Sequence, residues 1–354
     1  LGFIMTTEEL QQVSEDHLPK KPLAISFRWL LGVYAIIPIC LLLQLVDSHF
    51  WGGFLKEALP TSPNHFVFFN ILFGIPHIVA SAVVMTSNVD YLKTFKVKVI
   101  AMTLALAVFF GLGSQWLPYY FMYILVASWT VLHVLKQQHG LARGVCQLSD
   151  RQFNIQLYLS VAAGILVYIG IFLKNNLSPA EVLVIKSLIS VLSIALVVST
   201  FSCQKSVPTL FGKMFLWANA FLVFSGFYLF AHEHYFLAIL VPRLVHDITA
   251  YIFYVTHDYN RHSVEPRNFI YRGAKKIGLS IFLVLPLLSF AIAFGLQQYG
   301  DYLCQVLIEF FFGVEIRRVV TLVVIGYLSL MHYYTESFTW KGDSPYRQFI
   351  TFTK

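Results

Sequence analysis

Long apolar stretches separated by short polar connections run along the whole chain. About 20 apolar residues suffice to cross the hydrocarbon core of a bilayer, and on this rule about ten stretches qualify as membrane-spanning helices. They lie near residues 23–46, 65–86, 97–113, 118–138, 153–174, 180–200, 211–231, 235–257, 277–297 and 319–338. The segment 303–316 is too short to span and is expected to lie at the interface or to re-enter the membrane. The predicted fold class is therefore all-α, a polytopic integral membrane helical bundle.

The charges of the polar connections predict the orientation of these helices. Basic residues gather in the connections at 87–98, 136–152, 201–213 and 258–276, whereas the alternate connections are neutral or acidic, apart from the Arg317–Arg318 pair. The positive-inside rule then places the basic connections and both termini in the cytoplasm.

A cytoplasmic tail is expected over 1–22, a single transmembrane domain over 23–340 and a second cytoplasmic tail over 341–354. The first 22 residues are polar and acidic, so no cleavable signal peptide is expected, and Met5 is a candidate natural start.

Composition agrees with a membrane protein and excludes several other classes. Of the 354 residues, 57% are hydrophobic and only 12% are charged, whereas soluble domains carry about 25% charged residues. Basic cytoplasmic loops explain the net charge of +7 without a nucleic-acid partner. Four scattered cysteines without a CxxC pair indicate neither a disulfide framework nor a thiolate metal site. No internal repeat is evident, which disfavours a transporter built on inverted repeats.

The stretch 230–262 carries the most unusual chemistry, because ionisable side chains interrupt an apolar run. Ionisable groups are costly in hydrocarbon, so they face the interior of a bundle and mark functional sites. Arg243 and Asp247 are spaced i,i+4 and are expected either to neutralise one another or, for Arg243, to contact an anionic head group or a carboxylate substrate.

Four histidines on four different predicted helices form the central hypothesis. His77, His133, His246 and His332 lie at comparable depth, in the inner half or near the middle of the membrane, as a shared site requires. Imidazole suits iron, zinc, copper and nickel. Because no cysteine partner is present, iron is the preferred metal, with zinc and copper next.

Polar neighbours accompany two of these histidines. Glu336 follows His332 by one helical turn and Gln137 follows His133 by one turn, so each pair shares a helix face. Glu336 is expected either to bind the metal or to orient a histidine.

The remaining histidines are assigned other positions. His257 shares the face of His246 but lies about 16 Å further along the helix, too far for both to bind one ion. It is expected in an inner layer with Glu336, Gln137 and His139, where a second metal could bind, or at the cytoplasmic mouth. Solvated positions are expected for His17, His49 and His65, and the turn with His232, Glu233 and His234 is read either as a metal-holding triplet or as exposed loop.

Prolines and tyrosines lie close to these predicted ligands. Pro76 and Pro242 are expected to kink their helices and to open space beside His77 and His246. Four tyrosines are expected either to line a pocket for an apolar substrate or to pack in the core: Tyr251, Tyr254, Tyr333 and Tyr334.

Four segments carry a resemblance to known proteins: GIPHIVAS (74–81), WTVLHVLKQQHG (129–140), VPRLVHDITAYIFYVTHDYNRH (241–262) and MHYYTESFTWKGDSPYR (331–347). They resemble a group of polytopic bacterial membrane proteins and, distantly, the Brp/Blh-type carotene dioxygenases, membrane enzymes that cleave β-carotene to retinal. The Gly-Leu-Pro-His element of that family matches Gly74-Ile75-Pro76-His77. The resemblance implies one iron bound by intramembrane histidines and a bacterial inner membrane location.

The match to that family is partial. Ile-Val-Ala-Ser follows the proline–histidine pair where the family favours Gly-Ala-Leu-Asp, and its closely spaced later histidines are not reproduced. The chain also has more predicted helices. The resemblance therefore implies the iron site more strongly than the carotene substrate. The HxxxH and HxxHH boxes of membrane desaturases are absent from the sequence.

Three functions follow as hypotheses. The first is a membrane oxidoreductase or oxygenase in which dioxygen, an electron donor and a lipid-soluble substrate (a lipid, isoprenoid or carotenoid) meet at the metal. Glu336, Gln137 and Asp247 would orient ligands or handle protons. The second is a b-type haem protein with two histidines as axial ligands. The third is a proton- or metal-coupled transporter, or a proton-coupled channel, with a relay through His246, Asp247, His257 and Asp258. Membrane lipids are partners in all three.

Overall fold

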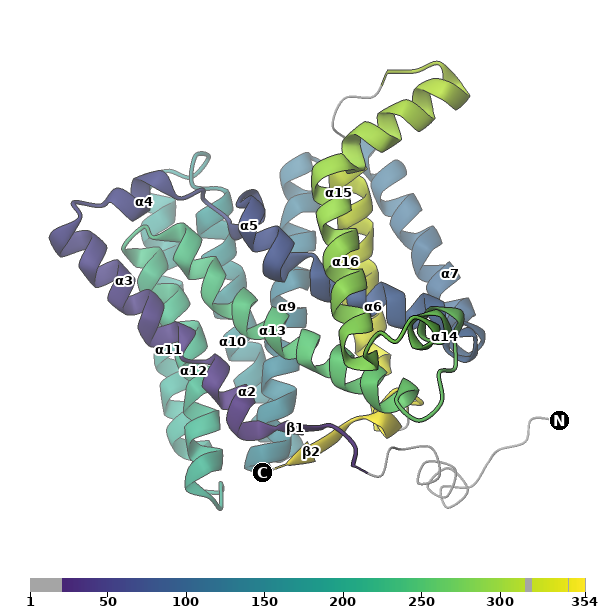
Figure 1. Cartoon of the computed structure of the whole chain (residues 1–354). Coiled ribbons are helices and arrows are strands. Elements are labelled where there is room, and N and C mark those ends of the chain that lie inside the picture. The colour runs from purple at the N-terminus through teal and green to yellow at the C-terminus, as the bar shows by residue number, and fades with distance from the viewer. Residues whose placement is uncertain (1–20, 316–319, 343, 354) are drawn as a thin grey trace. The chain divides into compact units, whose positions relative to one another are not determined.

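The structure is a computed structural model that describes residues 21–315, 320–342 and 344–353 (Figure 1). Most of the predicted N-terminal tail, with Met5 and His17, and the Arg317–Arg318 pair lie outside the described residues. The regular elements of the described part are helices, apart from two strands of three residues each. The prediction of an all-α helical membrane protein is confirmed.

The chain divides into two compact units. Unit 1 comprises the described residues within Leu1–Trp29, Asn70–Phe110 and Thr249–Lys354, and unit 2 comprises Leu30–Phe69 and Gly111–Ile248. The helix α13 (Tyr235–His262) begins in unit 2 and ends in unit 1. The prediction of a single transmembrane domain over 23–340 stays a prediction.

Unit 1 is built on long helices that pack beside a shorter one. Its elements are β1 (Ala24–Ser26), the π-helical turn η2 (Asn70–Gly74), α6 (Pro76–Ser87), α7 (Val89–Gly111), α14 (Phe269–Lys276), α15 (Ile281–Phe312), α16 (Val320–Thr339), η3 (Arg347–Phe349) and β2 (Thr351–Thr353). α6 packs against both α15 and α16, which also contact one another (Figure 1).

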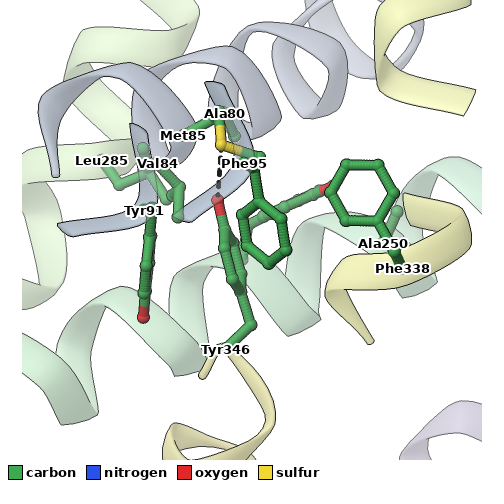
Figure 2. Packing of buried hydrophobic residues seen from close by; sticks show 10 residues of the cluster. Ala80, Val84, Met85, Tyr91, Phe95, Ala250, Leu285, Phe338 and Tyr346 are labelled. Carbon is green, nitrogen blue, oxygen red and sulfur yellow. Dashed lines mark hydrogen bonds between the residues drawn. The ribbon is translucent and has the colours of Figure 1, made fainter. Parts of the chain in front are cut away.

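An aromatic cluster fills the core of unit 1 (Figure 2). The rings of Tyr91 and Tyr346 stack with their centroids 4.0 Å apart, and the Tyr346 hydroxyl donates to the sulfur of Met85 over 3.5 Å. The parallel pairing of β1 with β2 also joins the two ends of this unit, with Ile25 opposite Phe352. Much of the predicted C-terminal tail is thereby packed into unit 1.

Unit 2 is a helical bundle that begins with α2 (Phe27–Val33), which crosses from unit 1 near its start. Its other elements are α3 (Ile36–Phe50), α4 (Phe54–Ala58), η1 (Pro63–His65), α5 (Val67–Phe69), α8 (Gly113–Trp116), α9 (Tyr119–Cys146), α10 (Asp150–Phe172), α11 (Pro179–Cys203) and α12 (Leu210–Ala231). α10 contacts α9, α11 and α12, and α3 packs on α12. Capping boxes at Ser149 and Ser178 begin α10 and α11 by satisfying free backbone N–H groups.

Eight helical segments in the described part are long and apolar enough to cross a membrane. They are Phe27–Phe50, Val67–Ser87, Val89–Gly111, Asp150–Phe172, Pro179–Cys203, Leu210–Ala231, Tyr235–His262 and Ile281–Phe312. The two other predicted spans, 118–138 and 319–338, lie on α9 and α16, which carry His133 and His332. The membrane orientation and the cytoplasmic termini stay predictions.

Pro76 lies within the helical segment Val67–Ser87, just after a π-helical turn. It is the first residue of α6, a position at which a proline loses no helical hydrogen bond. The preceding π-helical turn ends with the Ile75 N–H donating to the carbonyl of Asn70 over 2.9 Å. Pro242, by contrast, lies inside α13, as expected.

The segment 303–316 differs from the prediction. Most of it continues α15, which runs for 32 residues from Ile281 to Phe312 and ends at Gly313 with φ +64°. The single Gly300 between the two apolar stretches does not break the helix, since an isolated glycine costs only about 1 kcal/mol. As far as Phe312 the segment is thus the end of a longer helix, and its position at the membrane interface stays a prediction.

Candidate metal centre

Unit 1 brings two of the four predicted ligands together. His77 lies in the first turn of α6 and His332 lies on α16, and both side chains are buried. Their ring centroids are 4.9 Å apart and their planes cross at 75°. A coordinating nitrogen of each ring lies within 4.8 Å of one on the other.

This spacing fits two adjacent ligands of one metal. With metal–nitrogen bonds of 2.0–2.1 Å, two imidazoles at roughly 90–110° about an ion have centroids about 4.5–5 Å apart. Edge-to-face packing of two rings without a metal covers a similar range. The spacing alone therefore does not distinguish a metal site from ring packing. The hydrogen bonds made by Nδ1, the outer nitrogen of each ring, are the better indication of a metal site.

The outer nitrogen of His77 is fixed by its own helix. Its Nδ1 lies 3.0 Å from the carbonyl oxygen of Phe73. A carbonyl can only accept, so the proton resides on Nδ1 and the lone pair on Nε2. Metal-binding histidines are commonly held in this way, with one nitrogen donating to a carbonyl and the other directed at the ion.

His332 is held by a chain of two hydrogen bonds. The Tyr254 hydroxyl donates to Oε1 of Glu336 over 2.7 Å, and its oxygen lies 3.4 Å from Nδ1 of His332. Since the hydroxyl proton is used on the carboxylate, Nδ1 of His332 is the donor to Tyr254. The i,i+4 spacing of His332 and Glu336 is confirmed at 3.9 Å between Nδ1 and Oε1.

Unit 2 brings the other two predicted ligands together. His133 on α9 and His246 on α13 are buried, with ring centroids 4.7 Å apart and an interplanar angle of 79°. Nδ1 of His246 lies 2.8 Å from Oε1 of Gln137. Gln137 thus orients His246 on another helix, whereas the sequence had paired it with His133, which precedes it by one turn on its own helix.

A buried polar network stands behind Gln137 in unit 2. Nε2 of Gln138 donates to Oε1 of Gln137 over 3.0 Å, and the Tyr34 hydroxyl lies 3.0 Å from Oε1 of Gln138 and 3.2 Å from Oδ1 of Asn219. Asn219 is anchored in turn by donating to the carbonyl of Phe215. Sequence reasoning missed Tyr34 and Asn219, although an asparagine within the apolar run 211–231 was a visible signal.

The pairing of Arg243 with Asp247 is confirmed. Nε of Arg243 lies 3.6 Å from Oδ1 of Asp247, one turn further along α13, and its guanidinium lies over the ring of Phe69 at 5.9 Å. Asp247 therefore has a basic neighbour on its own helix, as the i,i+4 spacing indicates.

The structure places the two further candidate ligands outside these pairs. Nε2 of His139 lies 3.0 Å from Oγ of Ser160, and Nε2 of His257 lies 2.8 Å from the hydroxyl of Tyr91. Within the described residues, neither belongs to a group of three side chains able to hold a metal ion.

His234 is a correction to the exposed-loop interpretation. Its side chain is only 4% exposed, and Nε2 lies 2.9 Å from Oδ2 of the buried Asp47. His232, Glu233, His49 and His65 are exposed, as expected.

Buried histidines and Glu336 thus form groups that can hold a metal ion. No protein-family model matches the chain, and neither do any curated protein or solved structure. The resemblance to the Brp/Blh-type carotene dioxygenases stays a prediction. The donor set of imidazoles and a carboxylate, without thiolate, is the chemistry favoured by non-haem iron and zinc.

Proposed function

We propose that this integral membrane protein is a histidine-ligated metal oxidoreductase, with non-haem iron as the metal and a lipid-soluble substrate such as a lipid, isoprenoid or carotenoid. The proposal assigns His77 and His332 of unit 1 and His133 and His246 of unit 2 as ligands. It places the protein in a bacterial inner membrane, where substrate enters from the bilayer and an electron donor supplies reducing equivalents.

The observation that carries the proposal is the control of the outer ring nitrogens. Nδ1 of His77, His246 and His332 each faces an oxygen, so that Nε2 is the nitrogen for coordination. For His246 and His332 the oxygen belongs to a side chain on another helix, whereas the bond of His77 to the carbonyl four residues earlier is also made by the exposed His49 and His232.

The protein's own groups have defined tasks in this proposal. The buried histidines hold the ion away from water, and Glu336 with Tyr254 offers a carboxylate–phenol pair that can hold a proton beside His332. When bound, iron would supply the activation of dioxygen that no side chain can provide. Zinc and copper suit the same ligands.

A haem bound between the histidines of either pair is disfavoured by the geometry. Within each pair the rings meet edge to face at 4.7–4.9 Å, which leaves no room for a macrocycle between them. Axial ligands lie on opposite faces of a haem, whereas these rings are spaced as neighbours.

The test is elemental analysis of the detergent-purified protein together with an absorption spectrum. We expect stoichiometric iron without a Soret band, and loss of metal when any of the four proposed histidines is replaced by alanine. His139→Ala is the matched control, because His139 is equally buried but bonds to Ser160. Stoichiometric zinc would rule out the proposed redox function. Purified protein without any transition metal would rule out the metal site itself.

A further inference from the structure

A pocket of about 430 Å³ lies in unit 1 where two connections between helices meet. One is the turn between α6 and α7, and the other runs from the end of α13 to the start of α14 (Figure 1). Asn268 joins them by donating to Oγ of Ser87 over 3.2 Å. The charged side chains lining the pocket are Asp90, Arg261, Arg267 and Arg272.

Arg261 forms the rigid wall of this pocket. Its guanidinium donates twice to Asp90, at 2.8 and 2.7 Å, and once to Oδ1 of Asn88 and once to the hydroxyl of Tyr91. The side chain is buried, and four hydrogen bonds occupy its guanidinium. Arg261 therefore holds the two connections together, and its charge is offset by Asp90.

Arg267 and Arg272 are the charges that remain available. Both are exposed, and neither forms an ion pair with any described residue. Partial burial, and after it the neighbouring Arg261, lower the pKa of the Arg267 guanidinium, while Asp90 and Glu265 act in the opposite direction. Three arginines against one aspartate give the lining a net charge of two positive units.

Two helix N-termini add to this positive charge. The lining includes Val89 and Asp90 at the start of α7, a helix of 23 residues, and Asn268 and Phe269 at the start of α14. The positive end of a helix dipole and its free N–H groups favour an anion. The two arginines that form no ion pair with described residues and the two helix N-termini thus all favour a negatively charged ligand in this pocket.

The position of the pocket indicates where the anion comes from. α6, α7 and α13 belong to segments long and apolar enough to span a membrane, and the pocket lies at their ends, which puts it at the membrane surface if they do. Phe269 and Val89 line it with side chains that are 76% and 62% exposed. Apolar side chains next to unpaired arginines suit a molecule that combines a phosphate with acyl chains.

We propose that this pocket binds a phosphate group carried by the head group of an anionic phospholipid. Arg267 and Arg272 contact the phosphate, and Phe269 contacts the lipid beneath it. The second source of the same chemistry is a soluble phosphate ester, and the experiment separates the two.

Binding to the full-length protein in detergent tests the proposal, with dioctanoyl phosphatidylglycerol as the lipid probe and glycerol 1-phosphate as the soluble one. Arg267→Ala/Arg272→Ala is expected to weaken lipid binding roughly thirtyfold, since each basic residue near an anionic lipid contributes about a factor of five. Lys275→Ala/Lys276→Ala removes the same charge from exposed positions of α14 that do not line the pocket, and a much smaller loss is expected.

A second variant keeps both arginines and changes the electrostatic potential of the pocket. Val89→Asp adds a negative charge to the lining, at a first-turn position where helices favour acidic residues, so the fold should tolerate it. It is expected to weaken lipid binding about as much as loss of one arginine. Equal losses of lipid affinity in the arginine and lysine variants would indicate a general attraction to a basic surface, and would rule out a lipid site in this pocket. Arginine-dependent binding of glycerol 1-phosphate that the lipid does not exceed would overturn the lipid assignment.

Discussion

At the scale of single residues, the proposed metal site rests on hydrogen bonds that fix the tautomers of its histidines. A neutral imidazole has two tautomers, and only the one with its proton on Nδ1 offers Nε2 to an ion. The oxygens of Phe73, Gln137 and Tyr254 select that tautomer.

Gln137 allows a direct test of this selection. Gln137→Leu removes the acceptor for Nδ1 of His246, and loss of such an outer partner typically lowers metal affinity 10–100-fold. Metal retained during competition with a chelator measures the effect. Gln156→Leu is the control, because Gln156 is a buried glutamine of the same unit whose side chain bonds to Ser199 and Thr200 instead. Unchanged retention in Gln137→Leu would separate Gln137 from the metal.

Asp47 and Glu233 allow a comparison of a buried and an exposed acid. Asp47 is buried and accepts from the N–H groups of Leu55 and Lys56 as well as from His234. We expect Asp47→Asn to lower the free energy of unfolding by on the order of 3 kcal/mol, because buried partners of a charge are left unsatisfied. Glu233→Gln breaks a half-exposed ion pair with Lys56 and should cost less than about 1 kcal/mol.

The same comparison has a pH dependence. The hydrogen bond and charge of Lys56 hold the pKa of Glu233 below its usual value. The small contribution of this pair is therefore present above the ordinary carboxyl pKa and is lost as pH falls through the lowered value. Thermal unfolding of both variants at neutral and acidic pH measures the two losses of stability. A larger loss in Glu233→Gln than in Asp47→Asn would contradict the prediction.

At the scale of elements, sequence reasoning succeeded where one helix contains both partners. The pairs Arg243–Asp247 and His332–Glu336 follow from the 3.6-residue repeat alone. The contacts of Gln137 with His246 and of Asp47 with His234 join different helices. Such contacts depend on which helices are neighbours and on how each is rotated about its axis. The sequence repeat within one helix gives no information on either.

Helix starts give a testable element-scale prediction. Ser178 caps α11 by accepting from the N–H of Glu181, while the Glu181 carboxylate accepts from the N–H of Ser178. Ser178→Ala should lower the free energy of unfolding by about 1 kcal/mol. Ser187→Ala, on the same helix, removes only a bond to the carbonyl of Leu183 and is expected to be nearly neutral in the same thermal unfolding assay. Equal effects would show that the cap adds no stability.

At the scale of the whole molecule, the all-helical membrane class was predictable because composition and the length of the apolar runs determine it. The division into two units was not, since it reflects contacts between segments far apart in sequence. Helix ends were also uncertain, as α9 and α13 continue past the predicted 138 and 257 to Cys146 and His262. Polar residues at a membrane boundary can remain helical, and hydropathy does not register this.

Orientation in the membrane is the whole-molecule prediction to test first. A single cysteine placed at exposed Lys205 should react with a membrane-impermeant maleimide only from the cytoplasmic side, and one at exposed His232 only from the opposite side. Intact cells and inverted vesicles provide the two sides. Cys40, Cys146 and Cys203 are buried, so Cys304 is the native thiol to replace beforehand. Reversed labelling would invert the predicted topology.

We expect the length of α15 to make the protein sensitive to the thickness of its surroundings. At 1.5 Å per residue its 32 residues measure about 48 Å along the helix, which bends in its last part (Figure 1), against a hydrocarbon core of about 30 Å. Its last residues, Phe310, Phe311 and Phe312, are exposed. Hydrophobic mismatch is relieved by tilting or by local thickening of the bilayer. Longer acyl chains would cover more of this end, so the protein should be sorted toward, and melt later in, thicker bilayers.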